Sequence, residues 1–94
     1  MDVRFFFDEH TGLPHIHVHG ITESEVEEVL RASGEDLPAK QSSRMKLGQT
    51  MAGRYLQVIY VPDDDLLGIF VVTAYELQGK AKQAYRRRRR KRGK

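Results

Sequence analysis

Residues 48–75, GQTMAGRYLQVIYVPDDDLLGIFVVTAY, decide the fold. Side chains alternate between the two faces of a β-strand, so residues 54–61 present one face that is rich in Leu, Val and Tyr. Residues 62–65 (PDDD) end this strand, because Pro cannot donate to a β-ladder and Asp favours turns. Residues 67–75 are apolar at nearly every position, which is typical of a strand covered on both faces. The pattern predicts a hairpin at the centre of a sheet.

Other segments extend this sheet. Residues 3–7 (VRFFF) are predicted as the first strand, and residues 43–47 (SRMKL) as a strand that pairs with the one beginning at Arg54. Residues 8–14 and 35–42 are predicted as loops, because they combine Gly or Pro with polar residues and show no period. We therefore expect an antiparallel sheet of three to four strands.

One helix has a well-defined start. Thr22 is a good N-cap, and Glu25, three residues later, completes a capping box. Ile21 and Val26 have the spacing of a hydrophobic staple around this cap. The Ser-Gly pair at residues 33–34 is expected to end the helix. With its apolar stripe packed on one face of the sheet, this helix completes a small α+β fold.

The C-terminal part of the chain divides at Tyr85. Residues 76–85 are predicted to form a short helix, which Gly79 weakens. Beyond it the sequence is almost purely basic, and blocks of like charge repel and are usually solvated. We therefore expect a single α+β domain over residues 1–85 and a disordered basic tail over residues 86–94.

Composition limits the class of protein. The chain has 94 residues and no Cys, which fits one domain and excludes a disulfide framework or a Cys-ligated zinc site. No segment has the features of a signal peptide or a membrane span, so we expect a cytoplasmic protein without a membrane partner. The formal net charge of +3 conceals an asymmetry. Residues 1–79 hold six Lys and Arg against thirteen Asp and Glu, a charge of −7, whereas residues 80–94 hold ten Lys and Arg and no acid, a charge of +10.

Three histidines alternate along the chain at His15, His17 and His19. On a strand they would share a face, and three imidazoles can hold Zn, Ni or Cu. A second interpretation places them on the irregular lead-in to the helix, without a joint role. A third uses His15 or His19 as a general acid or base, because imidazole titrates near neutral pH. We take His15 and His19 as candidate catalytic residues and expect no cofactor, while the metal alternative stays open.

Cations on the strands are candidates for a phosphate site. Guanidinium groups of Arg44 and Arg54 on one sheet face would bind phosphate and stabilise the charge that develops at phosphorus during RNA cleavage. Alternatively, each Arg pairs with an acid of the body. Lys46 is a candidate contact for nucleic acid. Tyr75, at the end of the last strand, is either a half-buried side chain or a platform on which a base stacks.

The basic run is a candidate site for polyanions. Its seven consecutive residues would neutralise several phosphates and bind nucleic acid in a salt-dependent manner that ignores sequence. Alternatives are a solvated tail without a role and a segment that docks on an acidic protein. The candidate nucleic-acid contacts are Arg86, Arg87, Arg88, Arg89, Arg90, Lys91 and Arg92.

Several short segments together resemble a known family. Residues 19–22 (HGIT) open the helix, and residues 53–56 (GRYL), 58–60 (VIY) and 70–75 (FVVTAY) follow in order. This arrangement is similar to the BrnT-like toxins and to related small bacterial domains of unassigned function, near the RelE-type ribonuclease fold. The resemblance implies a toxin of a bacterial toxin–antitoxin pair, which cuts RNA without a metal and is neutralised by an antitoxin protein. Carried onto this chain, it implies a catalytic role for His15 or His19, Arg44 and Arg54, with Tyr75 at the end of the central strand.

Two hypotheses follow. The first is a metal-independent endoribonuclease of the toxin type, similar to an mRNA interferase. The second is a non-catalytic module that binds nucleic acid or protein through its Arg-rich tail, because an acidic body repels RNA at low salt.

Overall fold

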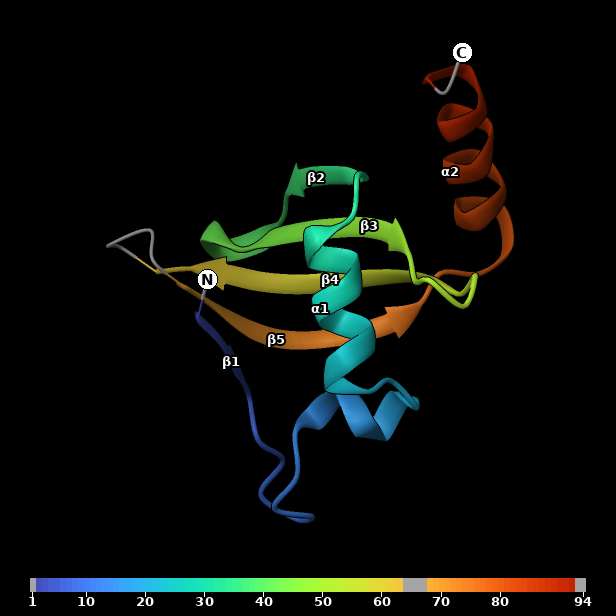
Figure 1. Cartoon of the computed structure of the whole chain (residues 1–94). Helices are drawn as coiled ribbons and strands as arrows, with labels where there is room; N and C mark the ends of the chain where they lie inside the picture. The colour runs from blue at the N-terminus through green and yellow to red at the C-terminus, as the bar shows by residue number, and fades with distance from the viewer. Residues whose placement is uncertain (1, 64–67, 93–94) are drawn as a thin grey trace.

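The computed structural model describes residues 2–63 and 68–92, and the side chains of all of these but Arg92 (Figure 1). Part of the expected acidic turn, at Asp64 and Asp65, and the first residue of the expected last strand, Leu67, lie outside the described residues. In chain order the elements are β1 (Asp2–Phe5), the 3₁₀-helix η1 (His15–His19), α1 (Glu23–Arg31), β2 (Glu35–Pro38), the 3₁₀-helix η2 (Lys40–Ser42), β3 (Arg44–Gln49), β4 (Tyr55–Pro62), β5 (Gly68–Glu76) and α2 (Gly79–Arg92).

The sheet has the strand order β1-β5-β4-β3-β2. The hairpin of β4 and β5 lies inside it, flanked by β3 on one side and β1 on the other, which confirms the central position predicted from residues 48–75. Strands β2 to β5 pair antiparallel. The molecule is therefore a small α+β domain with two helices and one five-stranded sheet.

Two expectations about the sheet are wrong. The sheet has five strands where three to four were predicted, because Glu35–Pro38 pairs with β3 although its sequence, EDLP, has no strand pattern. It is mixed and not antiparallel, because β1 runs parallel to β5, with Asp2 opposite Gly68 and Phe5 opposite Val71. Periodicity reports which face a side chain takes, and it carries no information about the direction of a partner strand.

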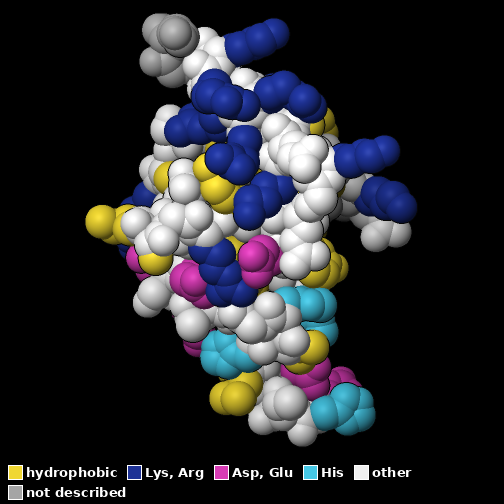
Figure 2. Space-filling view, turned by 90° about the vertical axis from the view of Figure 1, so that its right-hand side faces the viewer, with side chains coloured by type: hydrophobic (Ala, Val, Ile, Leu, Met, Phe, Trp, Pro, Cys, Tyr) yellow, Lys and Arg dark blue, Asp and Glu magenta, His cyan; other side chains and the backbone are white. Residues whose placement is uncertain are grey.

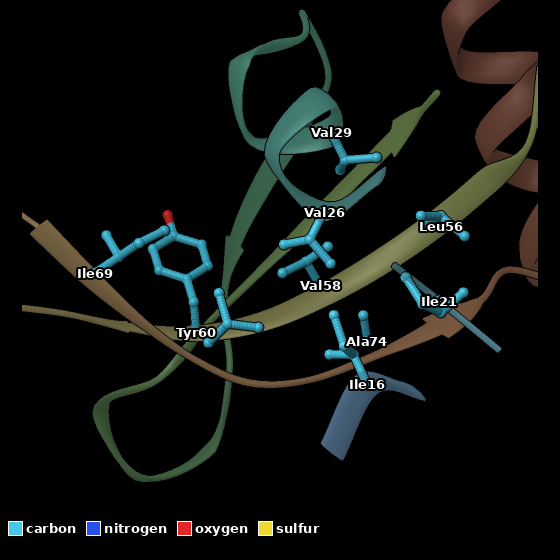
Figure 3. Close-up of a cluster of buried hydrophobic side chains, with 10 residues drawn as sticks. Ile16, Ile21, Val26, Val29, Leu56, Val58, Tyr60, Ile69 and Ala74 are labelled. Atoms are coloured by element: carbon cyan, nitrogen blue, oxygen red, sulfur yellow. The ribbon is translucent and has the colours of Figure 1, made fainter. Parts of the chain in front are cut away.

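Helix α1 covers one face of the sheet, and the main core lies beneath it (Figure 3). The capping box is present: Thr22 Oγ1 accepts from the N–H of Glu25, and Glu25 Oε1 accepts from the N–H of Thr22. Gly48 lets the helix approach β3, since a Cβ there would lie 3.1 Å from Val29 Cγ1. The buried residues of this core are Ile16, Ile21, Val26, Val29, Leu56, Val58, Tyr60, Ile69, Val71 and Ala74.

Helix α2 packs on the opposite face of the sheet. Tyr85 is 1 % exposed and forms a second, smaller cluster with Leu47 and Leu77. Along β3, Leu47 alternates with Lys46 and Gly48, which face α1, so this cluster lies on the other side. The helix runs through the basic residues to Arg92 instead of ending at Tyr85, so the expected boundary between domain and tail falls inside a helix.

Candidate functional site

The alternating histidines lie on the 3₁₀-helix η1, which leads into α1. The rings of His15 and His19 meet edge to face, with their centroids 5.3 Å apart. His17 points elsewhere, and its Nε2 lies 2.6 Å from Glu23 Oε1, which lowers the pKa of that carboxyl. The array therefore separates into a pair of imidazoles and a third imidazole bound to α1.

A carboxylate orients His15. Residues 8–13 form a tight turn, closed by a bridge between Phe7 and Pro14. The turn places Asp8 Oδ2 3.3 Å from Nδ1 of His15. Hydrogen bonds from the backbone of His10 and from His15 lower the pKa of Asp8, so it stays ionised. Because Nδ1 of His15 lies beside a carboxylate, its Nε2 is the nitrogen that can exchange a proton with a substrate.

Tyr75 completes this cluster from the end of β5. Its ring centroid lies 4.6 Å from that of His19, and its side chain is partly exposed. A surface hollow of about 250 Å³ opens here, and it is lined by His19, Tyr75, Glu76 and Gln78. Three of the five predicted catalytic residues, His15, His19 and Tyr75, are thus brought together.

Arg54 lies next to this hollow but is held by acidic partners. Its Nη1 donates to the carbonyl of Gly20 at 2.9 Å and to both oxygens of Glu25 at 3.1 Å, and its Nη2 lies 3.3 Å from Glu76 Oε1. The hydrogen bond to Glu25 raises the pKa of Arg54. Burial opposes ionisation of Glu25, but hydrogen bonds from Thr22 and Arg54 outweigh it and lower the pKa of this carboxyl. Arg54 therefore ties α1, η1 and β5 together at the edge of the hollow.

Arg44 does not join Arg54. Arg44 pairs with Tyr60 in the sheet, six positions along β4 from Arg54, which at about 3.3 Å per residue separates them by about 20 Å. Arg44 Nε donates to Asp36 Oδ1 at 2.8 Å, and the same carboxylate accepts from the Tyr60 hydroxyl at 2.5 Å. Burial and Asp36 raise the pKa of Tyr60 to about 12. Arg44 thus takes the alternative that the sequence left open, pairing with an acid of the body.

Lys46 is buried, contrary to its predicted role as a nucleic-acid contact. It is 8 % exposed, and its Nζ donates to the carbonyls of Leu30 and Ala32 at 3.1 and 2.9 Å. These carbonyls lie at the C-terminal end of α1, where the helix dipole favours a cation. Burial lowers the pKa of Lys46. The side chain serves the fold by closing this end of the helix.

The basic residues of α2 form a surface above the histidines. Figure 2 shows Lys and Arg side chains gathered over α2 and His side chains below them, on the same side of the molecule. One stripe of the helix, Gln83, Arg86, Arg87 and Arg90, lines a hollow of about 270 Å³. Arg89, Arg90 and Lys91 lie on the same helix, and the side chain of Arg92 is outside the described part of the chain.

Arg88 has a different role from its neighbours. Its Nε and Nη2 donate to the two oxygens of Glu35 at 2.6 and 2.8 Å. Glu35 is 9 % exposed, and this two-fold hydrogen bond raises the pKa of Arg88. The pair joins α2 to the edge strand β2. The guanidinium of Arg88 is therefore committed to the fold, whereas Arg86 and Lys82 lie over the ring of Tyr55 at 5.8 and 5.3 Å.

Sequence reasoning missed the residues that support the cluster: Asp8, Glu25, Glu76 and Gln78. Asp8 carried a usable signal, since an acid at the start of a Gly-Pro turn just before His15 can fold back on the imidazole. Glu76 and Gln78 follow Tyr75 directly, so a site at the end of β5 includes them by adjacency. The contacts of Glu25 with Arg54 join positions 29 apart in the chain, and no local pattern indicates them.

Comparison with known proteins gives no family: no family model, no curated protein and no solved structure matches this chain. Within residues 2–63 and 68–92, no three His, Cys, Asp or Glu side chains are placed to hold a metal ion. Over the same residues, no helix combines the length and apolar character needed to cross a membrane. The similarity to BrnT-like and RelE-type toxins stays a prediction from sequence.

Proposed function

We propose that this chain is a metal-independent endoribonuclease of the toxin type, which acts on RNA in the cytoplasm and has an antitoxin protein as its partner. The observation that carries the proposal is the pair of imidazoles on η1, with His15 oriented by Asp8 and His19 against Tyr75. Two imidazoles can supply the general base and the general acid that cleavage of RNA through its own 2′-hydroxyl uses.

In this reaction His15 is the general base. It takes the proton of the ribose 2′-hydroxyl, whose oxygen then attacks the adjacent phosphorus. The bond from phosphorus to the 5′-oxygen of the next nucleotide breaks, and His19 gives that oxygen a proton. The products are a 2′,3′-cyclic phosphate and a 5′-hydroxyl, and each imidazole ends in the protonation state opposite to the one in which it began.

The positive charge that stabilises the transition state comes from groups around the hollow. Arg54 lies beside the hollow, and its positive charge can stabilise the pentacoordinate phosphorus while its Nη2 stays with Glu76. Arg44 has no part in this step, because the register of β3 and β4 places it at the far end of the hairpin. The Lys and Arg side chains of α2 gather on the same side of the molecule as His side chains (Figure 2), and they attract the RNA backbone toward it.

A second candidate function is a non-catalytic module that binds nucleic acid through α2. It is favoured by the pairing of both predicted catalytic arginines with carboxylates, Arg44 with Asp36 and Arg54 with Glu25. In this case the histidine cluster is structural, and the basic helix carries the whole function.

Cleavage of a labelled RNA in the presence of EDTA tests the proposal. We expect fragments that end in a 2′,3′-cyclic phosphate, with a bell-shaped dependence of rate on pH. The variants His15→Gln and His19→Gln should each cut about 10²–10⁴-fold more slowly. His17→Gln is the matched control, since His17 lies on the same 3₁₀-helix and its ring contacts Glu23 instead of the imidazole pair.

The same experiment separates the two candidates. RNA that binds but stays intact at every pH would overturn the ribonuclease and support the binding module. Equal cleavage by the parent and by a double His15→Gln, His19→Gln variant would also exclude these residues as acid and base. Induced expression in a bacterium should arrest growth with the parent and with His17→Gln, but not with the double variant.

A further inference from the structure

We propose that the hollow lined by His19, Tyr75, Glu76 and Gln78 is the subsite for one nucleobase, and that it selects guanine. This inference rests on the proposed action on RNA and names the part of the substrate that the site reads. The hollow, of about 250 Å³, is smaller than the roughly 300–1,000 Å³ of pockets that enclose whole drug-sized ligands. Its size suits one ring system with the rest of the nucleotide in solvent.

Stacking holds the base. Tyr75 is 38 % exposed although it ends a central strand, so one part of its ring is open to a ligand. The ring is fixed in place by His19, at 4.6 Å between centroids, and His19 is in turn against His15. Base–aromatic stacking stabilises binding for every base alike. Tyr75 therefore accounts for affinity, and selection must come from the polar groups.

Glu76 supplies the selection. Its side chain is 41 % exposed and lines the hollow, while Arg54 Nη2 at 3.3 Å from Oε1 orients it. An ionised carboxylate has only acceptor sites. Guanine presents two adjacent donors on its Watson–Crick edge, N1–H and N2–H₂, which match the two oxygens of a carboxylate. Adenine, cytosine and uracil have no two adjacent donors on that edge, so a carboxylate that makes two contacts would meet at least one acceptor, which it repels.

Gln78 and His19 complete the subsite. The Gln78 amide offers N–H donors that can meet guanine O6, while its oxygen can rotate away. A base seated against Tyr75 and Glu76 leaves its ribose toward His19, which lines the same hollow. The nucleotide that is read is therefore next to the bond that the imidazole pair cuts, so cleavage should be adjacent to guanine.

The test measures binding of 3′-mononucleotides to the full chain by NMR, in EDTA. Guanosine, adenosine, cytidine and uridine 3′-monophosphates contain no phosphodiester, so the result does not depend on whether the chain cleaves RNA. We expect the guanosine nucleotide to bind at least about tenfold tighter than the others, with shifts at Tyr75, Glu76 and Gln78. The variant Glu76→Gln should abolish this preference and bring the four affinities together.

Two further variants make the test decisive. Glu27→Gln removes a carboxylate from the exposed side of α1 and should leave the preference unchanged. Gln78→Ala should weaken guanosine nucleotide binding even if Glu76→Gln disturbs the ion pair with Arg54. Equal affinity of the parent for all four nucleotides, or shifts confined to residues 79–92, would overturn the guanine subsite. Either result could coexist with cleavage of RNA, so the proposed function and the subsite fail separately.

Discussion

The two helices pack on opposite faces of one sheet but are held in different ways. Helix α1 begins at a complete capping box, has two fully buried valines and receives the Lys46 ammonium at its C-terminal end. Helix α2 begins at Gly79, whose φ of 61° is left-handed, and has no acid in its first turn. Among the described side chains of α2, Tyr85 alone is buried. The comparison indicates that α1 secures the fold, while α2 presents charge and can be removed more easily.

The largest effect on stability is expected on the α1 side. Ile21 is 1 % exposed and precedes the cap of α1, so Ile21→Ala leaves a cavity in the main core. We expect the free energy of unfolding, measured with urea, to fall by about 2–5 kcal/mol. Val18→Ala is the control, since Val18 is 57 % exposed and should change stability by less than about 0.5 kcal/mol. Equal losses in both variants would contradict the assignment of the core to this face.

A smaller and more local effect is expected for Tyr85→Ala. Tyr85 packs with Leu47 and Leu77 and faces the Tyr55 ring, so its loss frees α2 from the sheet. Hydrogen exchange should show that the amides of α2 lose protection while those of β4 and α1 keep it. The global free energy of unfolding should fall by less than in Ile21→Ala. Uniform loss of protection over the whole chain would show that the two helices belong to one cooperative unit.

The difference between the helices also explains what sequence could predict. The signals of α1 are local, since a cap, a staple and an apolar stripe lie within ten residues, and the structure has each of them. Arg and Lys have good intrinsic helix propensity, but the repulsion of seven adjacent charges favoured a disordered tail. What holds α2 is remote: Glu35 is 53 residues from Arg88, and Leu47 is 38 residues from Tyr85.

The candidate site divides in the same way. Residue type indicated His15, His19 and Tyr75, and the structure brings them together. Residue type also indicated Lys46 as a nucleic-acid contact. The alternation of side chains along β3 instead places Lys46 beneath α1. The pairing of each cation with a carboxylate depends on contacts between distant segments of the chain. No local sequence pattern predicts these contacts.

The cap itself is expected to contribute about 1 kcal/mol. Thr22→Ala removes the oxygen that accepts from the N–H of Glu25 and leaves an unsatisfied donor in the first turn of α1. Urea unfolding should show a loss of about 0.5–2 kcal/mol. Ser24→Ala, on the exposed side of the same turn, is the matched control and should be near neutral. If Thr22→Ala lowers the free energy of unfolding no more than Ser24→Ala does, α1 is held by packing alone.

Acid should weaken the α1 side gradually. Hydrogen bonds from His17 and from Thr22 and Arg54 keep the pKa values of Glu23 and Glu25 below their ordinary value of 4.5 in the folded chain. Below about pH 4.5 the unfolded chain therefore binds more protons than the folded chain, so the free energy of unfolding falls as pH falls. Glu25→Gln should flatten this pH dependence between roughly pH 5 and pH 3. Urea unfolding at each pH measures it. An unchanged slope would place the acid sensitivity elsewhere.

The smallest effect on stability, and a large one on binding, is expected from the exposed stripe of α2. Arg86, Arg87 and Arg90 line an open hollow and lie on the side of α2 away from the Glu35 contact. Replacing all three by Gln should lower the free energy of unfolding by at most about 1 kcal/mol, from the loss of the exposed contact of Arg86 with the Tyr55 ring, because Arg88 and Tyr85 still hold the helix. Affinity for single-stranded RNA should fall, since three phosphate contacts are lost.

The salt dependence of binding makes this last prediction specific. Each phosphate contact to a single strand contributes about 0.7 to the slope of log affinity against log salt, so the triple variant should lose about 2 from that slope. Arg31→Gln, an exposed cation at the end of α1 that pairs with Glu27, should leave the slope unchanged. If the triple variant keeps the salt slope of the parent, RNA binds elsewhere on the molecule and this stripe of α2 does not contact it. If it loses the slope and also unfolds, the charged stripe stabilises the helix and the two helices are more alike than their contacts indicate.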